Sequence, residues 1–121
     1  MAKTTLPPIW WPLMDAPDLT PGYCIVCGMT SPTEKHHPVK RSAGEMIDPI
    51  TGKKRRKPVF ELCGFGNNLR NANGRLYCHG MAHANMLHFR NDRGCVEYLA
   101  CDDPTRYADA LESDGWRPIC L

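Results

Sequence analysis

Cys78 and His79 are adjacent, with His83 four residues further on, and this run constrains the fold more than any other part of the chain. Two further groups of potential metal ligands lie upstream, namely Cys24-x-x-Cys27 and His36-His37. A set of thiolates suits a closed structural zinc site, whereas imidazoles with an open coordination position suit a hydrolytic metal ion. The sequence therefore predicts two metal sites with separate roles.

The cysteine content indicates the redox environment. The chain has 121 residues and seven cysteines, an odd number, and several of them are grouped with histidines. This pattern favours metal binding in a reducing compartment over a disulfide framework, and a domain of this size often needs such a staple. The apolar stretch Leu6–Leu13 is short and interrupted by prolines, so neither a secretion signal nor a membrane span fits. We expect a soluble, cytoplasmic protein.

Charge is unevenly distributed along the chain, although the net charge is only +2. Residues 35–57 contain eight Lys and Arg against two acids, and residues 97–114 contain six acids against one Arg. One region can therefore face a polyanion while the other faces solvent or a partner.

Pattern and turn signals divide the chain into three parts. We expect an extended N-terminal arm over 1–22 that packs Trp10 and Trp11 against the body, a core over 23–92, and a C-terminal strand and helix over 93–121. The expected elements are strands over 33–39, 59–62 and 96–100 and helices over 79–89 and 105–112, the last with Asp103-Pro104 at its start.

The Cys24-x-x-Cys27 spacing lets one turn supply two thiolates to a tetrahedral ion, and Cys63 and Cys78 can complete the set. Both later cysteines adjoin a turn or a helix start, as zinc ligands commonly do. Ordinary buried cysteines and a redox pair are the competing interpretations. Three cysteines are expected to be plain thiols, namely Cys95, Cys101 and Cys120.

The histidines divide by position. His36 and His37 are adjacent on a predicted strand, so their side chains should point to opposite faces and have different roles. One imidazole can bind a metal ion while the other accepts a proton from water. His79 and His83 are four residues apart on a predicted helix, so both can converge on one ion or phosphate. Cys78 points about 100° away around that helix, and His88 is expected to be structural.

Taken together, these motifs over residues 24–89 resemble the zinc-containing HNH endonucleases of the ββα-metal class, particularly phage-type members. The resemblance implies an α+β fold with a small ββα-metal core, a structural zinc held by four cysteines, an extended N-terminal arm and a C-terminal strand-helix extension. By motif, His37 matches the general base, and His36, His79 and His83 match the ligands of the catalytic divalent ion. The structural zinc set is Cys24, Cys27, Cys63 and Cys78.

One departure from the family concerns an asparagine. The family usually has one a few residues before the second cysteine pair, where its side chain fixes the loop of the catalytic histidine. Residues 53–62 contain none, and Asn67 and Asn68 follow Cys63 instead. We assign the role to Asn68.

The resemblance implies phosphodiester hydrolysis in DNA with one divalent ion, such as Mg²⁺, Mn²⁺, Ni²⁺ or Zn²⁺. It also implies a phage or mobile-element origin, with phage packaging proteins as partners. Basic residues of the 35–57 region are expected to bind DNA backbone phosphates, namely Lys40, Arg41, Lys53, Lys54, Arg55, Arg56 and Lys57.

Two other functions remain open from the sequence. A zinc-stabilised nucleic-acid-binding module without catalysis fits the basic region and the missing upstream asparagine. A thiol oxidoreductase fits Cys24-x-x-Cys27, but this motif lacks the strand-helix context that such enzymes have.

Overall fold

The computed structural model describes residues 8–39, 44–48, 50–65, 70 and 72–119. Its elements in chain order are the 3-10 helix η1 (Pro8–Leu13), β1 (Thr33–His36), β2 (Met46–Ile47), β3 (Lys54–Arg55), β4 (Phe60–Cys63), α1 (Cys78–His83), β5 (Leu87–Asp92), β6 (Cys95–Ala100), α2 (Tyr107–Ala110) and β7 (Arg117–Pro118). The strands form the antiparallel sheets β1-β4, β2-β3 and β5-β6-β7. The chain is thus a small mixed α/β domain with short helices and small sheets.

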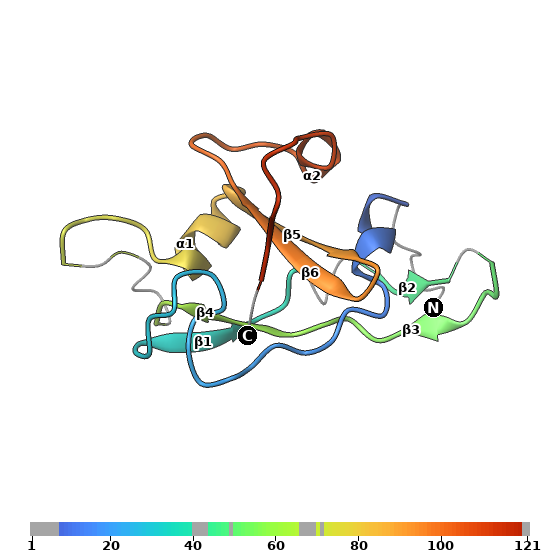
Figure 1. Cartoon of the computed structure of the whole chain (residues 1–121), viewed down its shortest axis with the longest axis horizontal. Helices are drawn as coiled ribbons and strands as arrows, with labels where there is room; N and C mark the ends of the chain where they lie inside the picture. The colour runs from blue at the N-terminus through green and yellow to red at the C-terminus, as the bar shows by residue number, and fades with distance from the viewer. Residues whose placement is uncertain (1–7, 40–43, 49, 66–69, 71, 120–121) are drawn as a thin grey trace.

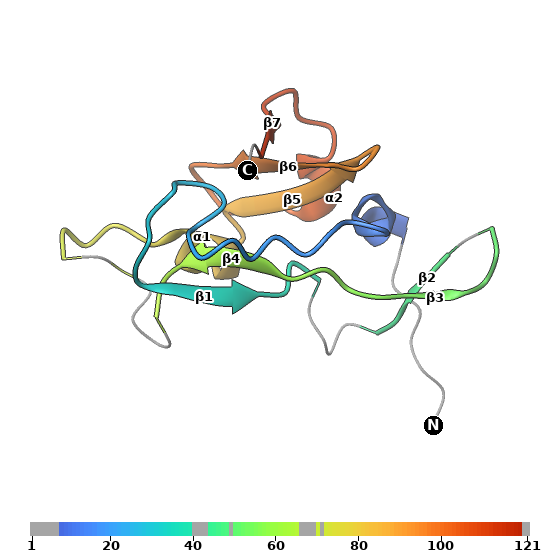
Figure 2. The same cartoon turned by 60° about the horizontal axis from the view of Figure 1, so that its bottom comes forward.

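β4 is the central strand of the fold. All four of its residues are buried. It pairs with β1 on one edge. Along the other edge, Leu19 N–H donates to Val59 O and Glu61 N–H donates to Leu19 O. Figures 1 and 2 show the β5-β6-β7 sheet covering β4 from one side, with α1 at one end of the pair. β4 therefore has neighbouring segments on both edges and a sheet over one side. Its pairing register with β1 determines which β1 residues lie next to it.

The hydrophobic core lies between β4 and β5. Phe60 and Phe89 are almost completely buried and meet edge to face at 4.9 Å. Leu13 of η1 is fully buried beside them, because η1 packs against β5. Each such side chain contributes about 1.5–3 kcal/mol through burial.

The N-terminal region differs from the extended arm that the prolines predicted. Residues 8–13 form a 3-10 helix, and Trp10 stacks on Tyr107 of α2 at a centroid distance of 4.7 Å. The expected packing of Trp10 on the body is therefore seen, but from a helical segment that reaches the C-terminal region.

The predicted helix over 79–89 is wrong beyond His83. α1 ends at that residue, Asn85 takes a left-handed φ of 62°, and β5 starts at Leu87. The apolar spacing of Leu87 and Phe89 is satisfied by a strand. A two-residue turn with positive φ at Arg93 and Gly94 then folds β5 back onto β6.

The C-terminal elements are close to the prediction. β6 spans Cys95–Ala100, which confirms the expected strand, and α2 is shorter than expected and starts after Arg106 rather than Asp103. The β5–β6 hairpin crosses the expected boundary between residues 92 and 93, so both parts share one sheet. Among the helices of the described residues, none has the length and apolar character needed to cross a membrane.

Candidate metal centres

Four cysteines from three separate segments meet at one end of the β1–β4 strand pair. The Sγ atoms of Cys24, Cys27, Cys63 and Cys78 all lie within 4.8 Å of one another. The Cys24–Cys27 turn is closed by Gly28 N–H donating to Cys24 O at 2.9 Å and by Cys24 N–H donating to Met29 O at 2.8 Å. The segments that carry Cys63 and Cys78 meet at the start of α1, where Cys78 N–H donates a hydrogen bond to Cys63 Sγ at 3.1 Å.

The spacing of the sulfurs fits a tetrahedral ion. Zinc–thiolate bonds of about 2.3 Å in a tetrahedron place sulfurs about 3.8 Å apart. Cys27 Sγ and Cys63 Sγ are 3.7 Å apart. Cys24, Cys63 and Cys78 are buried and only Cys27 is exposed. The four-cysteine cluster can therefore hold a metal ion such as zinc in a closed site.

The electrostatics of the cluster also favour a cation. A hydrogen bond from the Cys78 thiol lowers the pKa of Cys24 to about 4, despite its burial. That bond and burial raise the pKa of Cys78, and burial raises the pKa of Cys63 to about 11. Without a cation the cluster resists a second negative charge, so ion binding releases protons and adds to stability.

Three histidines form a second cluster, on the other side of the Cys78–His79 bond. The ring nitrogens of His36, His79 and His83 lie within 4.8 Å of one another. The Nε2 atoms of His79 and His83 are 3.0 Å apart, as expected for residues i and i+4 of α1. His36 ends β1 and meets the other two rings at centroid distances of 5.1 Å and 5.7 Å.

This separation also matches metal ligation. Metal–imidazole bonds of about 2.0–2.1 Å place two nitrogens about 3.4 Å apart in a tetrahedron and about 2.9 Å apart in an octahedron. The observed 3.0 Å lies in that range. His83 is exposed and His79 is buried, so one side of the cluster faces solvent. The residues present therefore fit an ion with open coordination positions.

Burial favours the neutral, ligating form of His36 and His79. Burial lowers the pKa of His36 to about 3, and the neighbouring His79 and His83 lower it further. Burial and His83 also lower the pKa of His79, against the opposing effect of Glu34. A neutral imidazole keeps one nitrogen lone pair for an ion.

Two residues fix the His79 ring from behind. Glu34 Oε2 lies 3.4 Å from His79 Nδ1, a charge contact without hydrogen-bond geometry. This is where second-shell carboxylates orient metal-binding histidines. Gly64 has a φ of +142°, and a Cβ there would lie 2.9 Å from His79 Cβ, so only glycine fits.

The histidine cluster opens into a cavity of about 720 Å³. Its polar lining includes the three histidines together with Lys35 and His37, and much of the rest of its lining is aromatic or apolar. The aromatic residues are Trp10, Phe89 and Tyr107. The cavity gives a substrate access to the cluster, which the cysteine site lacks.

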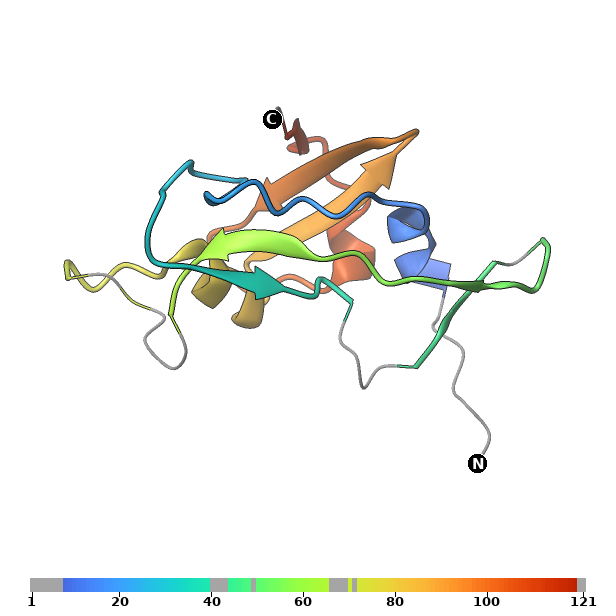
Figure 3. The same ribbon diagram turned by 90° about the horizontal axis from the view of Figure 1, so that it is seen from below.

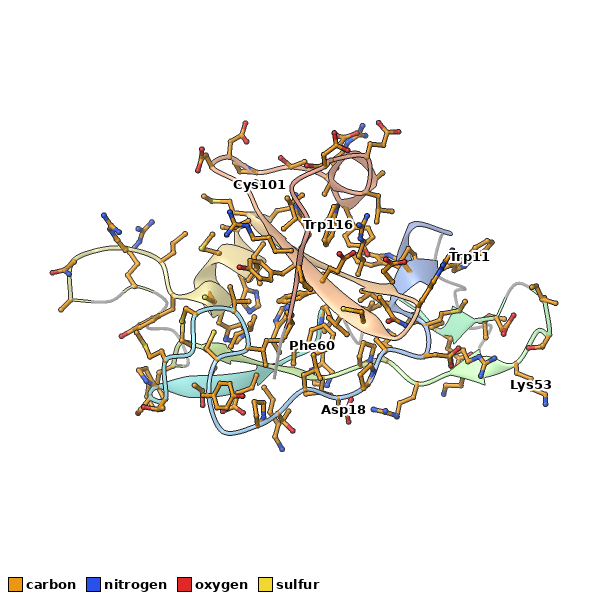
Figure 4. All side chains as sticks on the ribbon, in the orientation of Figure 1. Trp11, Asp18, Lys53, Phe60, Cys101 and Trp116 are labelled. Atoms are coloured by element: carbon orange, nitrogen blue, oxygen red, sulfur yellow. The ribbon has the colours of Figure 1, made fainter. Side chains whose placement is uncertain are left out.

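The remaining residues predicted from sequence divide into two groups. Asn68, Lys40 and Arg41 are outside the described residues. The run Lys53–Lys57 lies on and beside β3, away from both clusters. Figure 4 labels Lys53 next to β3, at the end of the molecule opposite α1. Three of these cations form ion pairs at 2.7–2.9 Å, namely Lys54 with Glu45, Arg55 with Asp48 and Arg56 with Asp18.

Sequence reasoning missed three residues near the histidine cluster. Glu34 could have been found, because residues i and i+2 of a strand share a face and His36 is two positions later. Trp10 and Tyr107 carry no such signal, since they reach the cavity through tertiary packing.

Comparisons with protein-family models, with curated proteins and with solved structures give no match for this chain.

Proposed function

We propose that this chain is a metal-dependent DNA endonuclease of the HNH type, with β1, β4 and α1 as its ββα-metal core and a structural zinc in the four-cysteine cluster. The single observation that carries the proposal is the convergence of His36, His79 and His83 beside His37 in one open cavity. Imidazoles spaced for a metal ion, next to a further histidine that can accept a proton, support metal-dependent phosphodiester hydrolysis.

The two adjacent histidines have different roles in the proposed mechanism. His36 ends β1 and His37 follows it, and both line the cavity. His36 is turned toward α1, whereas His37 is near enough to Asp18 to lower the pKa of that carboxyl, after the larger effect of Arg56. His37 then accepts the proton of the attacking water, in line with the scissile phosphorus.

His36, His79 and His83 would hold a divalent ion. Such an ion would supply positive charge to the scissile phosphate and to the departing 3′ oxygen, and the products would carry 5′ phosphate. Lys35 is exposed on the same cavity wall and can bind a neighbouring phosphate. Glu34 holds the His79 ring in position from behind.

The test is a nicking assay on supercoiled plasmid with zinc-loaded protein and Mg²⁺, Mn²⁺ or Ni²⁺ in separate reactions. We expect metal-dependent conversion to nicked or linear DNA, and a loss of about 10²-fold or more in rate for His37→Ala, the range for a general base. His88→Asn is the control, because it removes another histidine that lines the cavity. Thermal midpoints and zinc content must be equal in both variants.

Cleavage that is unchanged in His37→Ala contradicts the assigned base. No cleavage with any of the ions, together with salt-sensitive DNA binding, identifies the alternative, a zinc-stabilised nucleic-acid-binding module without catalysis.

A further inference from the structure

The cavity beside the histidine cluster is larger than an ion and one phosphate group require. Its volume of about 720 Å³ lies in the range of sites for small organic molecules. Figure 3 shows α1 beside the start of β5, η1 beside its end and α2 between them, and residues of all four elements line the cavity. The part that η1 and α2 line has no role in the proposed hydrolysis.

An ordered aromatic surface forms this second part of the cavity. Trp10 of η1 stacks on Tyr107 of α2, with ring centroids 4.7 Å apart and planes inclined by 27°. The Tyr107 hydroxyl donates a hydrogen bond to Phe89 O at 2.6 Å, and the side chain is buried, so the position of its ring is fixed. Trp10 is only partly buried, and Tyr107 covers one of its two faces. A flat aromatic surface is thus held in place before any ligand binds.

The aromatic surface and the histidine cluster are close enough for one ligand to contact both. The Phe89 ring lies 6.4 Å from the His36 ring, and the Phe89 carbonyl holds Tyr107. Leu13 and Leu87 also line the cavity and are almost completely buried. The cavity therefore has a polar end at the histidines and an apolar, aromatic end at Trp10.

The charge of the lining favours an anionic ligand. Among the described residues that line the cavity none is acidic, and Lys35 is exposed there. A ligand with a phosphate group and a flat ring matches both ends, with the phosphate at the histidines and Lys35 and the ring on Trp10. A nucleotide has both groups, whereas the phosphate of a lipid headgroup is not joined to a flat ring.

A nucleotide of DNA can use this aromatic surface only when its base is unpaired. Within a duplex the neighbouring base pairs cover both faces of each base, so a base must leave the stack before it can lie against a side chain. Stacking on an aromatic side chain accepts any base, because every base has a π face.

We infer that the cavity holds an unpaired nucleotide of the DNA substrate, with its base stacked on Trp10 and its phosphate at the histidine cluster. Tyr107 is a positioning residue, because it orients the Trp10 ring. This inference rests on the proposed function for the phosphate end, and it names the substrate class, which is DNA with an unpaired base at the cleavage site.

The experiment compares three DNAs that differ at one position. A short duplex carries at its centre a single unpaired nucleotide, the same nucleotide without its base, or no extra nucleotide. Each DNA is titrated with the zinc-loaded full chain and no other divalent ion, so that binding is measured without cleavage. We expect the wild-type chain to bind the unpaired base at least about tenfold more tightly than the abasic site or the paired duplex.

Three variants test the role of Trp10. Trp10→Leu keeps an apolar side chain against Tyr107 but removes the aromatic face, so it should bind all three DNAs equally. Trp10→Phe restores a ring and should recover most of the preference. Trp11→Leu is the matched control, because Trp11 is the neighbouring tryptophan of η1 and is outside the cavity lining (Figure 4). It should keep the wild-type preference, and thermal midpoints show whether each variant is folded.

Equal wild-type affinity for the unpaired base and the abasic site overturns the base site, and so does a wild-type chain that binds none of the three DNAs. This comparison needs no variant, so it decides even where Trp10→Leu does not fold. A preference that folded Trp10→Leu retains, or that Trp11→Leu loses to the same extent, overturns the assignment to Trp10.

The outcome is separable from the nuclease proposal. If the preference for an unpaired base is found but plasmid is never nicked, the base site stands and the catalytic assignment fails. If plasmid is nicked and the base adds nothing to affinity, the catalytic assignment stands and the base site fails.

Discussion

The two ligand clusters are joined by one peptide bond, between Cys78 and His79, yet they differ in burial, in the number of ligands and in access to the cavity. The cysteine cluster is mostly buried, has four ligands and lies away from the cavity, whereas the histidine cluster has three ligands and opens into it. A site with four thiolates has no position for a substrate, and a site with three imidazoles does. One short helix therefore contributes ligand residues to a closed cluster and to an open one.

The sequence order of α1 produces this separation. Cys78 begins the helix and points back to Cys63, and His79 and His83 lie on another face, toward His36. Gly64 allows the close approach of His79 to the cysteine side. The cysteine site therefore positions the histidine site, and its loss should disable both.

The largest expected effect is the removal of a cysteine ligand. Cys78→Ser should lose the bound zinc and at least about 3 kcal/mol of unfolding free energy, because structural zinc binding is part of the folding energy. Denaturant unfolding with elemental analysis measures both. Cys95→Ser is the control, since Cys95 is exposed and outside the cluster, and it should stay within about 0.5 kcal/mol. Equal behaviour of the two variants would contradict the structural role.

Removal of a histidine ligand should lower activity and leave stability almost unchanged. His83→Ala should leave zinc content and stability nearly unchanged, because His83 is exposed. Its cleavage rate should fall about 10³-fold, since one ligand of the exchangeable ion is lost. Plasmid nicking and thermal unfolding of the same preparation give the two values. A large loss of stability with little loss of activity would reverse the assignment of the two sites.

A smaller effect is expected from the residue behind His79. Glu34→Gln removes the charge that lies 3.4 Å from His79 Nδ1 and keeps the side-chain shape. Second-shell changes of this kind weaken metal affinity about 10–100-fold. Calorimetric titration with Mn²⁺ should show this loss with the zinc content unchanged. An unchanged Mn²⁺ affinity would show that Glu34 does not orient the ring.

The smallest effect concerns pH. The folded-state pKa of His36 is lowered to about 3, mainly by burial, whereas a histidine in the unfolded chain has a pKa of about 6.5. Below about pH 6.5 only the unfolded chain binds this proton, so stability is full above about 6.5 and falls as pH falls toward about 3. Denaturant midpoints between about pH 7.5 and 5.5 measure the slope, and His36→Asn should reduce it, with the remaining slope due to His79 and His88, whose pKa values are also lowered by burial. A slope that this substitution does not change would assign the titration to another group.

Two pairs of candidate metal ligands could be predicted to lie together, because each pair depends on local spacing. Cys24 and Cys27 share a turn, and His79 and His83 share a helical face, so short-range geometry already brings each pair together. The end of the helix could not be placed in this way, because Leu87 and Phe89 fit a helical or a strand pattern until β6 pairs with them. The left-handed Asn85 is the local signal that decides it.

The basic region shows a second limit of sequence reasoning. Counting charges predicts an unbroken cationic surface over Lys53–Lys57. In the folded chain, however, Asp15 and Asp18 lie far away in sequence and pair with Arg55 and Arg56. Such pairs depend on tertiary contacts. The run Lys53–Lys57 is therefore partly neutralised in the folded chain.

Elemental analysis of the purified protein after mild chelation tests the central claim of two unlike metal sites most directly. The account predicts one zinc per chain that chelation does not remove, together with a second divalent ion that is lost and rebinds. His83→Ala should remove only the second ion. A chain with disulfides and no zinc, or one in which both ions leave together, would contradict the account.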